Sequence, residues 1–160
     1  MKTLVAYDSK HGTVKECAEK LARKLADQVT VSNISKKQQW PKIDDYDNVI
    51  IGASIHAGKV QNSVKKYCQE NLEQLLGKKV GIFLCTMTPA EEAYHYIEEQ
   101  FPKELQQHAA VNSCFGGAVF FERMNFVERF IMKKITKSSE NIYQVSEDAI
   151  GNFTGAFSEI

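Results

Sequence analysis

The chain has 160 residues, of which 43% are hydrophobic and 25% are charged, a composition typical of a soluble globular protein. This length suits one domain with a sizeable core, so we expect a single domain over residues 1–160. The 20 basic and 20 acidic residues give a formal net charge of zero, so we expect no nucleic acid partner. The chain shows no signal segment, and no apolar run approaches the roughly 20 residues that span a bilayer. The expected location is therefore cytoplasmic.

The N-terminal region predicts a strand, a polar turn and a helix. Residues 4–7 are a short apolar run, typical of a strand that is buried on both faces. In the turn at residues 8–13, Gly12 permits a sharp bend, and Ser9 and Thr13 supply hydroxyl groups. Amide groups and the dipole at the helix start favour an anion, so the predicted ligand is a phosphate monoester. The alternative is that these residues serve only as turn and cap. The buried face of the helix repeats as Val14, Cys17, Ala18, Leu21, Ala22 and Leu25.

This turn matches neither of the common nucleotide-binding motifs. No Gly-Lys-Ser/Thr follows at the P-loop spacing, and Gly12 stands alone where a dinucleotide fold has three glycines. The four cysteines and four histidines show no metal-ligand spacing, so we predict no metal site. The cysteines at positions 17, 68, 85 and 114 are expected to be buried free thiols.

Four further apolar segments predict strands, at residues 29–34, 48–53, 80–85 and 113–120. The connection at residues 35–47 lacks apolar periodicity, so we expect only a turn or two there, with Trp40 as a packing plug. Helices are predicted at residues 60–75 with Gly77 as a left-handed cap, from residue 90 to about residues 101–102, and at residues 143–157. This alternation predicts an α/β fold, a three-layer α/β/α sandwich around a five-stranded parallel sheet.

Three polar loops follow predicted strands one, three and four. They span residues 8–13, 54–58 and 86–89, and all are rich in small or hydroxylated residues. In strand order 2-1-3-4-5, the first and third strands meet where the order reverses, and ligands bind at that edge. A site that holds a phosphate in the first loop and a flat ring between the other two loops would suit FMN. Flavodoxins are the standard example of this strand order with FMN bound at this edge.

Two stretches carry a resemblance to the flavodoxin family: Asp8-Ser-Lys-His-Gly-Thr13 after the first strand, and Gly52-Ala-Ser-Ile-His-Ala-Gly58 after the third. The segment at residues 117–135 is similar to the aromatic and basic helix of the short bacterial, quinone-linked protoporphyrinogen dehydrogenase branch. The resemblance implies a flavodoxin-like fold that binds FMN through Ser9, Lys10, His11, Gly12, Thr13, Val14, Ser54, Ile55, His56, Ala57, Gly58, Thr86, Met87 and Thr88.

The first and third loops depart from the family pattern. Flavodoxins favour Thr/Ser-x-Thr-Gly-x-Thr, whereas His11 and Val14 occupy two of the hydroxyl positions here. Thr13 and the backbone amides must then carry more of the phosphate binding. The third loop lacks the acidic and aromatic residues of many flavodoxins, so His56, Met87 and Tyr94 are the nearest candidates to flank the flavin.

The segment at residues 121–137 interleaves cations with aromatic and aliphatic side chains, and it admits three interpretations. It could be an amphipathic helix on an anionic membrane near a quinone pool. Its cations could hold the propionates of a tetrapyrrole substrate. It could also be a crossover helix with core aromatics and solvated lysines. The first two interpretations give the same candidate contact residues, Arg123, Phe126, Arg129, Phe130, Lys133 and Lys134.

The resemblance leaves two main functions and one lesser alternative. The first is an FMN-dependent dehydrogenase of the protoporphyrinogen IX type that passes electrons to a quinone, peripheral to the inner face of the cell membrane. The second is a non-enzymatic electron carrier that docks to a redox partner protein, and the third is a flavodoxin-like fold that has lost its flavin. No catalytic side chain is predicted, because a bound flavin carries the redox chemistry. The zero net charge mildly disfavours an ordinary carrier, since strongly charged surfaces speed docking.

Overall fold

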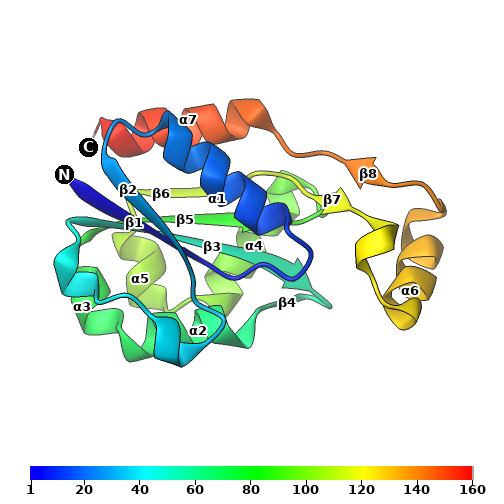
Figure 1. The fold of residues 1–160 in the computed structure, drawn as a ribbon, viewed down its shortest axis with the longest axis horizontal. Coiled ribbons are helices and arrows are strands. Elements are labelled where there is room, and N and C mark those ends of the chain that lie inside the picture. Colours follow the sequence, from blue (N-terminus) through cyan, green and yellow to red (C-terminus); the bar gives the residue numbers. More distant parts are fainter. Residues whose placement is uncertain (160) are drawn as a thin grey trace.

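The computed structural model describes residues 1–159. Figure 1 shows a twisted sheet with helices on both faces. Its parallel strands lie in the order β2-β1-β3-β5-β6, which confirms the predicted order of the five strands and the three-layer α/β/α class. Their bounds are β1 Lys2–Tyr7, β2 Gln28–Asn33, β3 Asn48–His56, β5 Lys79–Cys85 and β6 Val111–Cys114, while the short β4, Lys59–Val60, pairs antiparallel with the end of β3.

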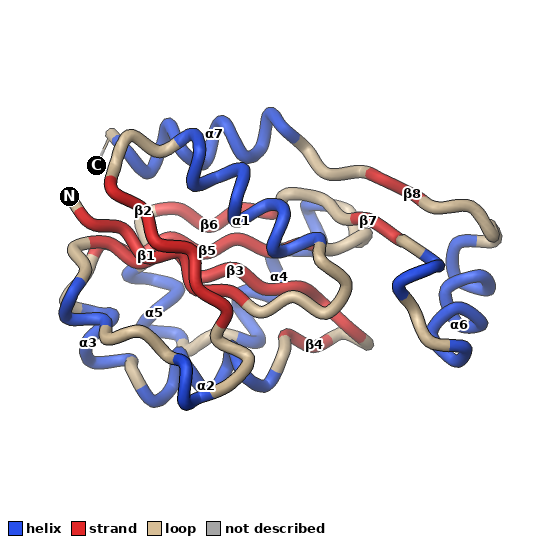
Figure 2. Tube along the Cα trace, viewed as in Figure 1, coloured by secondary structure: helices blue, strands red, loops and turns tan. Residues whose placement is uncertain are grey.

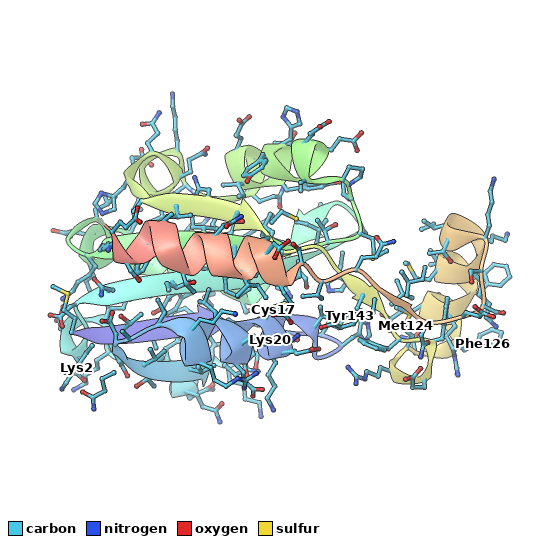
Figure 3. The ribbon with its side chains drawn as sticks, turned by 90° about the horizontal axis from the view of Figure 1, so that it is seen from above. Lys2, Cys17, Lys20, Met124, Phe126 and Tyr143 are labelled. Atoms are coloured by element: carbon cyan, nitrogen blue, oxygen red, sulfur yellow. The ribbon has the colours of Figure 1, made fainter. Side chains whose placement is uncertain are left out.

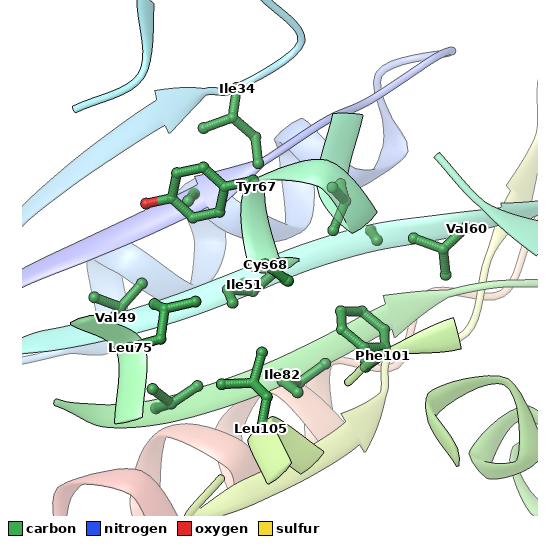
Figure 4. Close-up of a cluster of buried hydrophobic side chains, with 14 of the residues drawn as sticks. Ile34, Val49, Ile51, Val60, Tyr67, Cys68, Leu75, Ile82, Phe101 and Leu105 are labelled. Carbon is green, nitrogen blue, oxygen red and sulfur yellow. The ribbon is translucent and has the colours of Figure 1, made fainter. Parts of the chain in front are cut away.

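Helices cover both faces of the sheet (Figure 1). The first face carries α1, Thr13–Lys24, and α7, Glu147–Ser158. The second carries α2, Asn62–Glu70, α3, Leu72–Leu76, α4, Ala90–Gln100, and α5, Lys103–His108. Figure 4 shows how Tyr67, Leu75 and Leu105 from these helices reach the strand residues Ile51 and Ile82. Because β1, β3 and β5 are covered on both faces, their buried residues run continuously, whereas the edge strand β2 alternates.

Several predicted features are confirmed. The connection between β2 and β3 holds only two short 3-10 turns, η1, Lys37–Gln39, and η2, Ile43–Asp45. Trp40 plugs the core edge, because its indole Nε1 donates to the Ile34 carbonyl at 2.9 Å and its ring meets Tyr67 edge-on. The helix that begins at residue 90 ends before Pro102. The four cysteines are buried and free.

The predicted strand at residues 113–120 is wrong beyond Cys114. Gly116 has a φ of 82°, and a Cβ there would lie 2.0 Å from the Gln144 carbonyl oxygen, so the chain turns out of the sheet at a position only glycine suits. Residues beyond the turn form β7, Ala118–Val119, which pairs antiparallel with β8, Ile142–Tyr143.

Two predicted helix boundaries are also wrong. The last helix begins at Glu147 and not at residue 143, because the Ser146 hydroxyl caps it by accepting from the Ala149 amide at 3.0 Å. The helix predicted at residues 60–75 starts only at Asn62, since Val60 belongs to β4, and it breaks at Asn71. Gly77 follows with a φ of −85°, so it is not the predicted left-handed cap.

Residues 118–143 form an excursion, here called the arm, that leaves the sheet edge and returns to α7. It contains β7, η3, Phe121–Arg123, α6, Phe126–Thr136, and β8. Figures 1 and 2 show α6 standing clear of the three-layer body. None of the described side chains of α6 is buried, and Phe126 and Phe130 are 78% and 56% exposed. The interpretation of this segment as a crossover helix with core aromatics is therefore wrong for α6.

The tight packing of β3 against β5 yields a stability prediction. A Cβ at Gly52 would lie 2.2 Å from the Phe83 ring, whereas one at Gly155 on α7 would meet nothing within 4 Å. We expect Gly52→Ala to lower the free energy of unfolding by about 1–3 kcal/mol through overpacking. Gly155→Ala, the matched control, should raise it by roughly 0.5–1 kcal/mol. Urea denaturation measures both, and equal effects of the two variants would contradict the packing argument.

Candidate functional site

The three predicted loops meet at the carboxyl edge of the sheet and line one cleft. We call residues 8–13, 54–58 and 86–89 loops one, two and three. The cleft has a volume of about 470 Å³, within the range that holds one drug-sized ligand. Of the fourteen residues predicted to bind the cofactor, all line this cleft except Gly12, which is the N-cap residue of α1 directly beside it.

Loop one ends in an anion-binding geometry. Gly12 has a φ of 93°, and no side chain caps α1 through it. The first amides of a helix have no acceptor within the helix, so those of α1 are available to a ligand. The Gly12 amide donates to the Ser9 hydroxyl at 3.0 Å, and Thr13 is only 9% exposed. Val14, at the family's hydroxyl position, belongs to the apolar core as well as the cleft wall. These groups suit a phosphate, with Thr13 and the backbone as donors.

Gln61, which the sequence analysis did not single out, joins loops one and two. Its Nε2 donates to the Asp8 carbonyl at 3.1 Å and to the Ser54 hydroxyl at 2.8 Å, and its Oε1 accepts from the Ser54 amide at 3.0 Å. Asp8 also accepts from the Ser63 hydroxyl. A polar residue just before a helix is usually interpreted as a cap, so no pattern in the sequence indicated that Gln61 joins two loops.

His56 in loop two is held as a neutral ring. Its Nε2 lies 2.9 Å from the Ser54 hydroxyl, and its ring centroid lies 5.9 Å from that of His11. Burial lowers the pKa of His56, and the nearby charges of Lys10 and His11 lower it further. The ring is therefore uncharged at neutral pH and can contact a flat apolar ligand without a desolvation cost for charge.

Loop three is braced internally and against the start of the arm. The Thr86 hydroxyl accepts from the Thr88 amide at 3.1 Å, and the Thr86 amide donates to the Gly116 carbonyl at 2.8 Å. Next to it, Cys85 also lines the cleft. A hydrogen bond with Cys17 and burial hold the pKa of Cys85 well above its ordinary value. Its thiol therefore stays protonated, and it supplies no thiolate nucleophile.

Tyr94, predicted as a candidate to flank the flavin, is 42% exposed and does not line the cleft; Tyr96 does. Successive helix residues differ by about 100°, so two positions along α4 point to nearly opposite sides. The sequence placed an aromatic residue near loop three correctly but could not decide which face of α4 turns toward it.

The arm forms a wall of the cleft that the sequence analysis missed. The arm residues that line the cleft are Ala118, Val119, Met124, Glu128, Ile131, Met132 and Ile135. The helical spacing of the last four of these residues indicates one shared face of α6, but the surface that this face meets depends on tertiary structure. The predicted contact residues Phe126, Arg129, Phe130, Lys133 and Lys134 do not line the cleft. The outward side chains Phe126 and Phe130 are exposed, as Figure 3 shows for Phe126 at the tip of the arm.

Arg123, the remaining predicted contact residue, joins the arm to loop one. Its Nη1 donates to the His11 carbonyl at 3.0 Å. On the same contact, the His11 Nδ1 lies 3.1 Å from the Arg123 carbonyl and its Nε2 lies 2.8 Å from a Glu128 carboxylate oxygen. The Lys10 ammonium lies 3.1 Å from that same oxygen. The arm is thus attached to the predicted phosphate loop by charged hydrogen bonds.

Within residues 1–159, no group of three or more His, Cys, Asp or Glu side chains is arranged to hold a metal ion. Across the same residues, none of the helices combines the length and apolarity that crossing a membrane requires.

Comparisons with known proteins agree with this geometry. A flavodoxin domain family model matches residues 4–144. The chain is 25% identical over 150 residues to the quinone-linked protoporphyrinogen IX dehydrogenase of Escherichia coli (strain K12), covering 87% of this chain and 81% of that protein. The fold resembles Streptococcus pneumoniae TIGR4 flavodoxin, with a TM-score of 0.58, 14% identity and 99% of each chain covered. It also resembles a Lactobacillus acidophilus flavoprotein in complex with FMN, with a TM-score of 0.50, 16% identity, and 72% and 91% of the two chains covered.

The family model matches well over half of the chain, and the strand order and the loop cleft are those expected of this family. The chain belongs to the flavodoxin domain family.

Proposed function

We propose that this protein is a single-domain FMN-binding redox protein whose cleft holds the phosphate on loop one and the flavin ring between loops two and three. The observation that carries the proposal is the uncapped start of α1, which opens beside the buried Thr13 hydroxyl in a cleft large enough for one such ligand. Gln61 supports it by holding loops one and two together before any ligand binds.

The chain's own residues bind and orient the cofactor. Thr13, Ser9 and the α1 amides hold the phosphate, while neutral His56 and Met87 border the ring position. When bound, FMN accepts and passes on electrons or a hydride. Met124, Ile131, Met132 and Ile135 on the arm present an apolar wall along one side of the cleft, in which Ile131 and Ile135 are still 48% and 68% exposed. Such a wall suits a flat, apolar electron donor or acceptor better than it suits a small polar one.

For the reaction, we favour oxidation of a protoporphyrinogen-type substrate with a quinone as acceptor. Two observations support it: the likeness to a protein of that name in Escherichia coli, and the apolar wall that the arm adds to the flavin cleft. The alternative is a carrier that passes electrons to a partner protein. A carrier needs only an exposed ring edge, so the arm's inner wall is not required for it.

We also propose that the outer face of the arm contacts the anionic inner surface of the cell membrane. Phe126, Val127 and Phe130 are exposed, and Arg129, Lys133 and Lys134 lie among them on α6. An apolar strip bordered by cations suits the interface of an anionic bilayer, where quinones are dissolved. The protein would then be cytoplasmic and attached peripherally through residues 121–137.

The phosphate site is tested by comparing FMN with riboflavin, which lacks the phosphate. We expect Thr13→Ala to weaken FMN binding roughly tenfold or more, because a hydrogen bond to a charged group is worth about 1.5–3 kcal/mol. Riboflavin binding should be unchanged. Thr30→Ala, at an exposed threonine on β2, is the control. Flavin fluorescence quenching measures each affinity. An equal loss for both flavins would place the phosphate elsewhere, and no binding of either flavin to the wild-type protein would end the proposal.

The enzyme is distinguished from the carrier by a variant of the arm's inner wall. We expect Met132→Glu to lower quinone-coupled oxidation of protoporphyrinogen IX about tenfold or more, since it puts a charge where an apolar substrate packs. Reduction of a small one-electron acceptor by the chemically reduced flavoprotein should be unaffected. Val127→Glu, on the 62% exposed outer position, should leave both rates unchanged in membrane-free assays. Activity with the small acceptor alone in the wild-type protein would favour the carrier.

Membrane contact is tested by sedimentation with phosphatidylserine-containing vesicles. Each lysine near an anionic surface contributes about 1 kcal/mol, so Lys133→Glu with Lys134→Glu should weaken binding roughly 30-fold. Lys65→Glu with Lys66→Glu reverses an equivalent pair on α2 and should have little effect. Binding that is unchanged by the arm variant, or equally weakened by the control, would remove the arm from membrane contact.

A further inference from the structure

Loop one and the arm meet through a reciprocal contact that the cofactor site does not need. The Arg123 side chain donates to the His11 carbonyl, and the His11 side chain faces the Arg123 carbonyl in return. Glu128 adds a carboxylate that His11 and Lys10 both reach. In this contact, the His11 and Glu128 side chains are only 14% and 22% exposed. The contact is therefore better shielded than an ordinary surface ion pair.

The His11 ring contacts two polar groups on the arm. Its two ring nitrogens face a backbone carbonyl at 3.1 Å and a carboxylate at 2.8 Å. The charged and titratable groups that face it are Lys10 on its own loop, His56 on β3, Arg123 on η3 and Glu128 on α6. Glu128 is the anion among them, so it is the group on α6 that attracts loop one.

Glu128 itself stays ionised at neutral pH. Partial burial raises its pKa, but hydrogen bonds from Lys10 and His11 outweigh that effect, and its pKa is lower than usual. Its second oxygen lies 3.4 Å from the Asn125 amide, in a capping box at the start of α6. One carboxylate thus fixes the first turn of α6 and attaches it to loop one.

The position of α6 depends on such polar contacts because apolar packing does not hold it. None of its described side chains is buried. The base of the arm is tied separately to α1, where the Lys20 ammonium donates to the Tyr143 hydroxyl at 3.0 Å, as Figure 3 illustrates. With the base fixed, the contact of Glu128 with loop one decides whether α6 closes the cleft.

We propose that His11 and Glu128 are positioning residues that hold α6 closed as the inner wall of the substrate cleft. This inference rests on the proposed function, because it assigns α6 to the substrate side of the flavin. The cleft of about 470 Å³ holds one drug-sized ligand with the arm closed. A bulky substrate beside the flavin therefore enters only when the arm moves outward.

This assignment also explains the departure of loop one from the family pattern. His11 occupies a position where flavodoxins favour a hydroxyl that faces the phosphate. Here its ring is turned to η3 and α6. A position that other members use for the cofactor is used in this chain to hold the arm.

The contact is tested by hydrogen exchange at the α6 amides, with intrinsic exchange rates corrected for pH. At pH 6, Glu128→Gln should exchange roughly threefold to tenfold faster than wild type, as expected for the loss of a partly buried charge network. Glutamine also serves in capping boxes, so the helix start is kept. Glu140→Gln removes one charge from an exposed position of the same arm and should match wild type.

Two variants of His11 separate positioning from a general structural role. His11→Lys keeps a donor beside the Glu128 carboxylate and should retain the protection of α6. His11→Gln loses the ring that contacts both Arg123 and Glu128 and should lose that protection. Equal protection of α6 in all variants would overturn the proposal.

The same measurements are made with and without FMN, so the two proposals fail separately. A protein that binds no FMN but shows the predicted exchange pattern refutes only the proposed function. If the protein binds FMN but the exchange rates of the α6 amides are the same in the His11 and Glu128 variants as in wild type, only the positioning role is refuted. In an active preparation, Glu128→Gln should raise the KM for a bulky substrate by a larger factor than the factor by which it lowers the rate of reduction of a small acceptor.

Discussion

The start of α1 is the feature on which the rest of this site depends. A helix N-terminus presents amide donors and a positive dipole end, and these groups need an anion or water as partner. Here Gly12 opens that end into the cleft, Thr13 adds a nearly buried hydroxyl, and Asp8 is fixed by Ser63 and Gln61. Because β1 and β3 are neighbours in the sheet, loop two lies where a ring attached to that anion can reach it.

Loop one also holds the arm. Lys10 and His11 both contact Glu128, so the Lys10 charge beside the cofactor site is already partly neutralised. A phosphate in this loop depends more on Thr13 and backbone amides than on side-chain charge. The same two residues decide where α6 lies. Cofactor binding and arm position therefore share a set of groups, and a change in one alters the electrostatic surroundings of the other.

The arm has two faces with different surroundings. Its inner face, with Met132 and Ile135, borders the cleft, while its outer face exposes Phe126 and Phe130 among lysines. Exposing an apolar outer face of this kind to water is unfavourable in free energy, so we expect another surface to cover it. The cations on the same face favour an anionic surface as that cover. A helix that closes a redox cleft and also contacts a membrane would place the cleft next to a quinone dissolved in that membrane.

The sequence by itself determined the fold class and the three loops, because buried parallel strands and amphipathic helices leave strong periodic signals. The strand order came from the resemblance to flavodoxins. Four decisions came only from tertiary structure. The chain left the sheet at Gly116 because the Gln144 carbonyl lies where a side chain would be. Tyr96 and not Tyr94 faced the cleft because of the way α4 packs. Gln61 joined two loops, and Glu128 reached His11 across 117 positions of sequence. Local patterns specify which face of an element is apolar, whereas contacts between distant segments depend on how the completed layers bring their loops together.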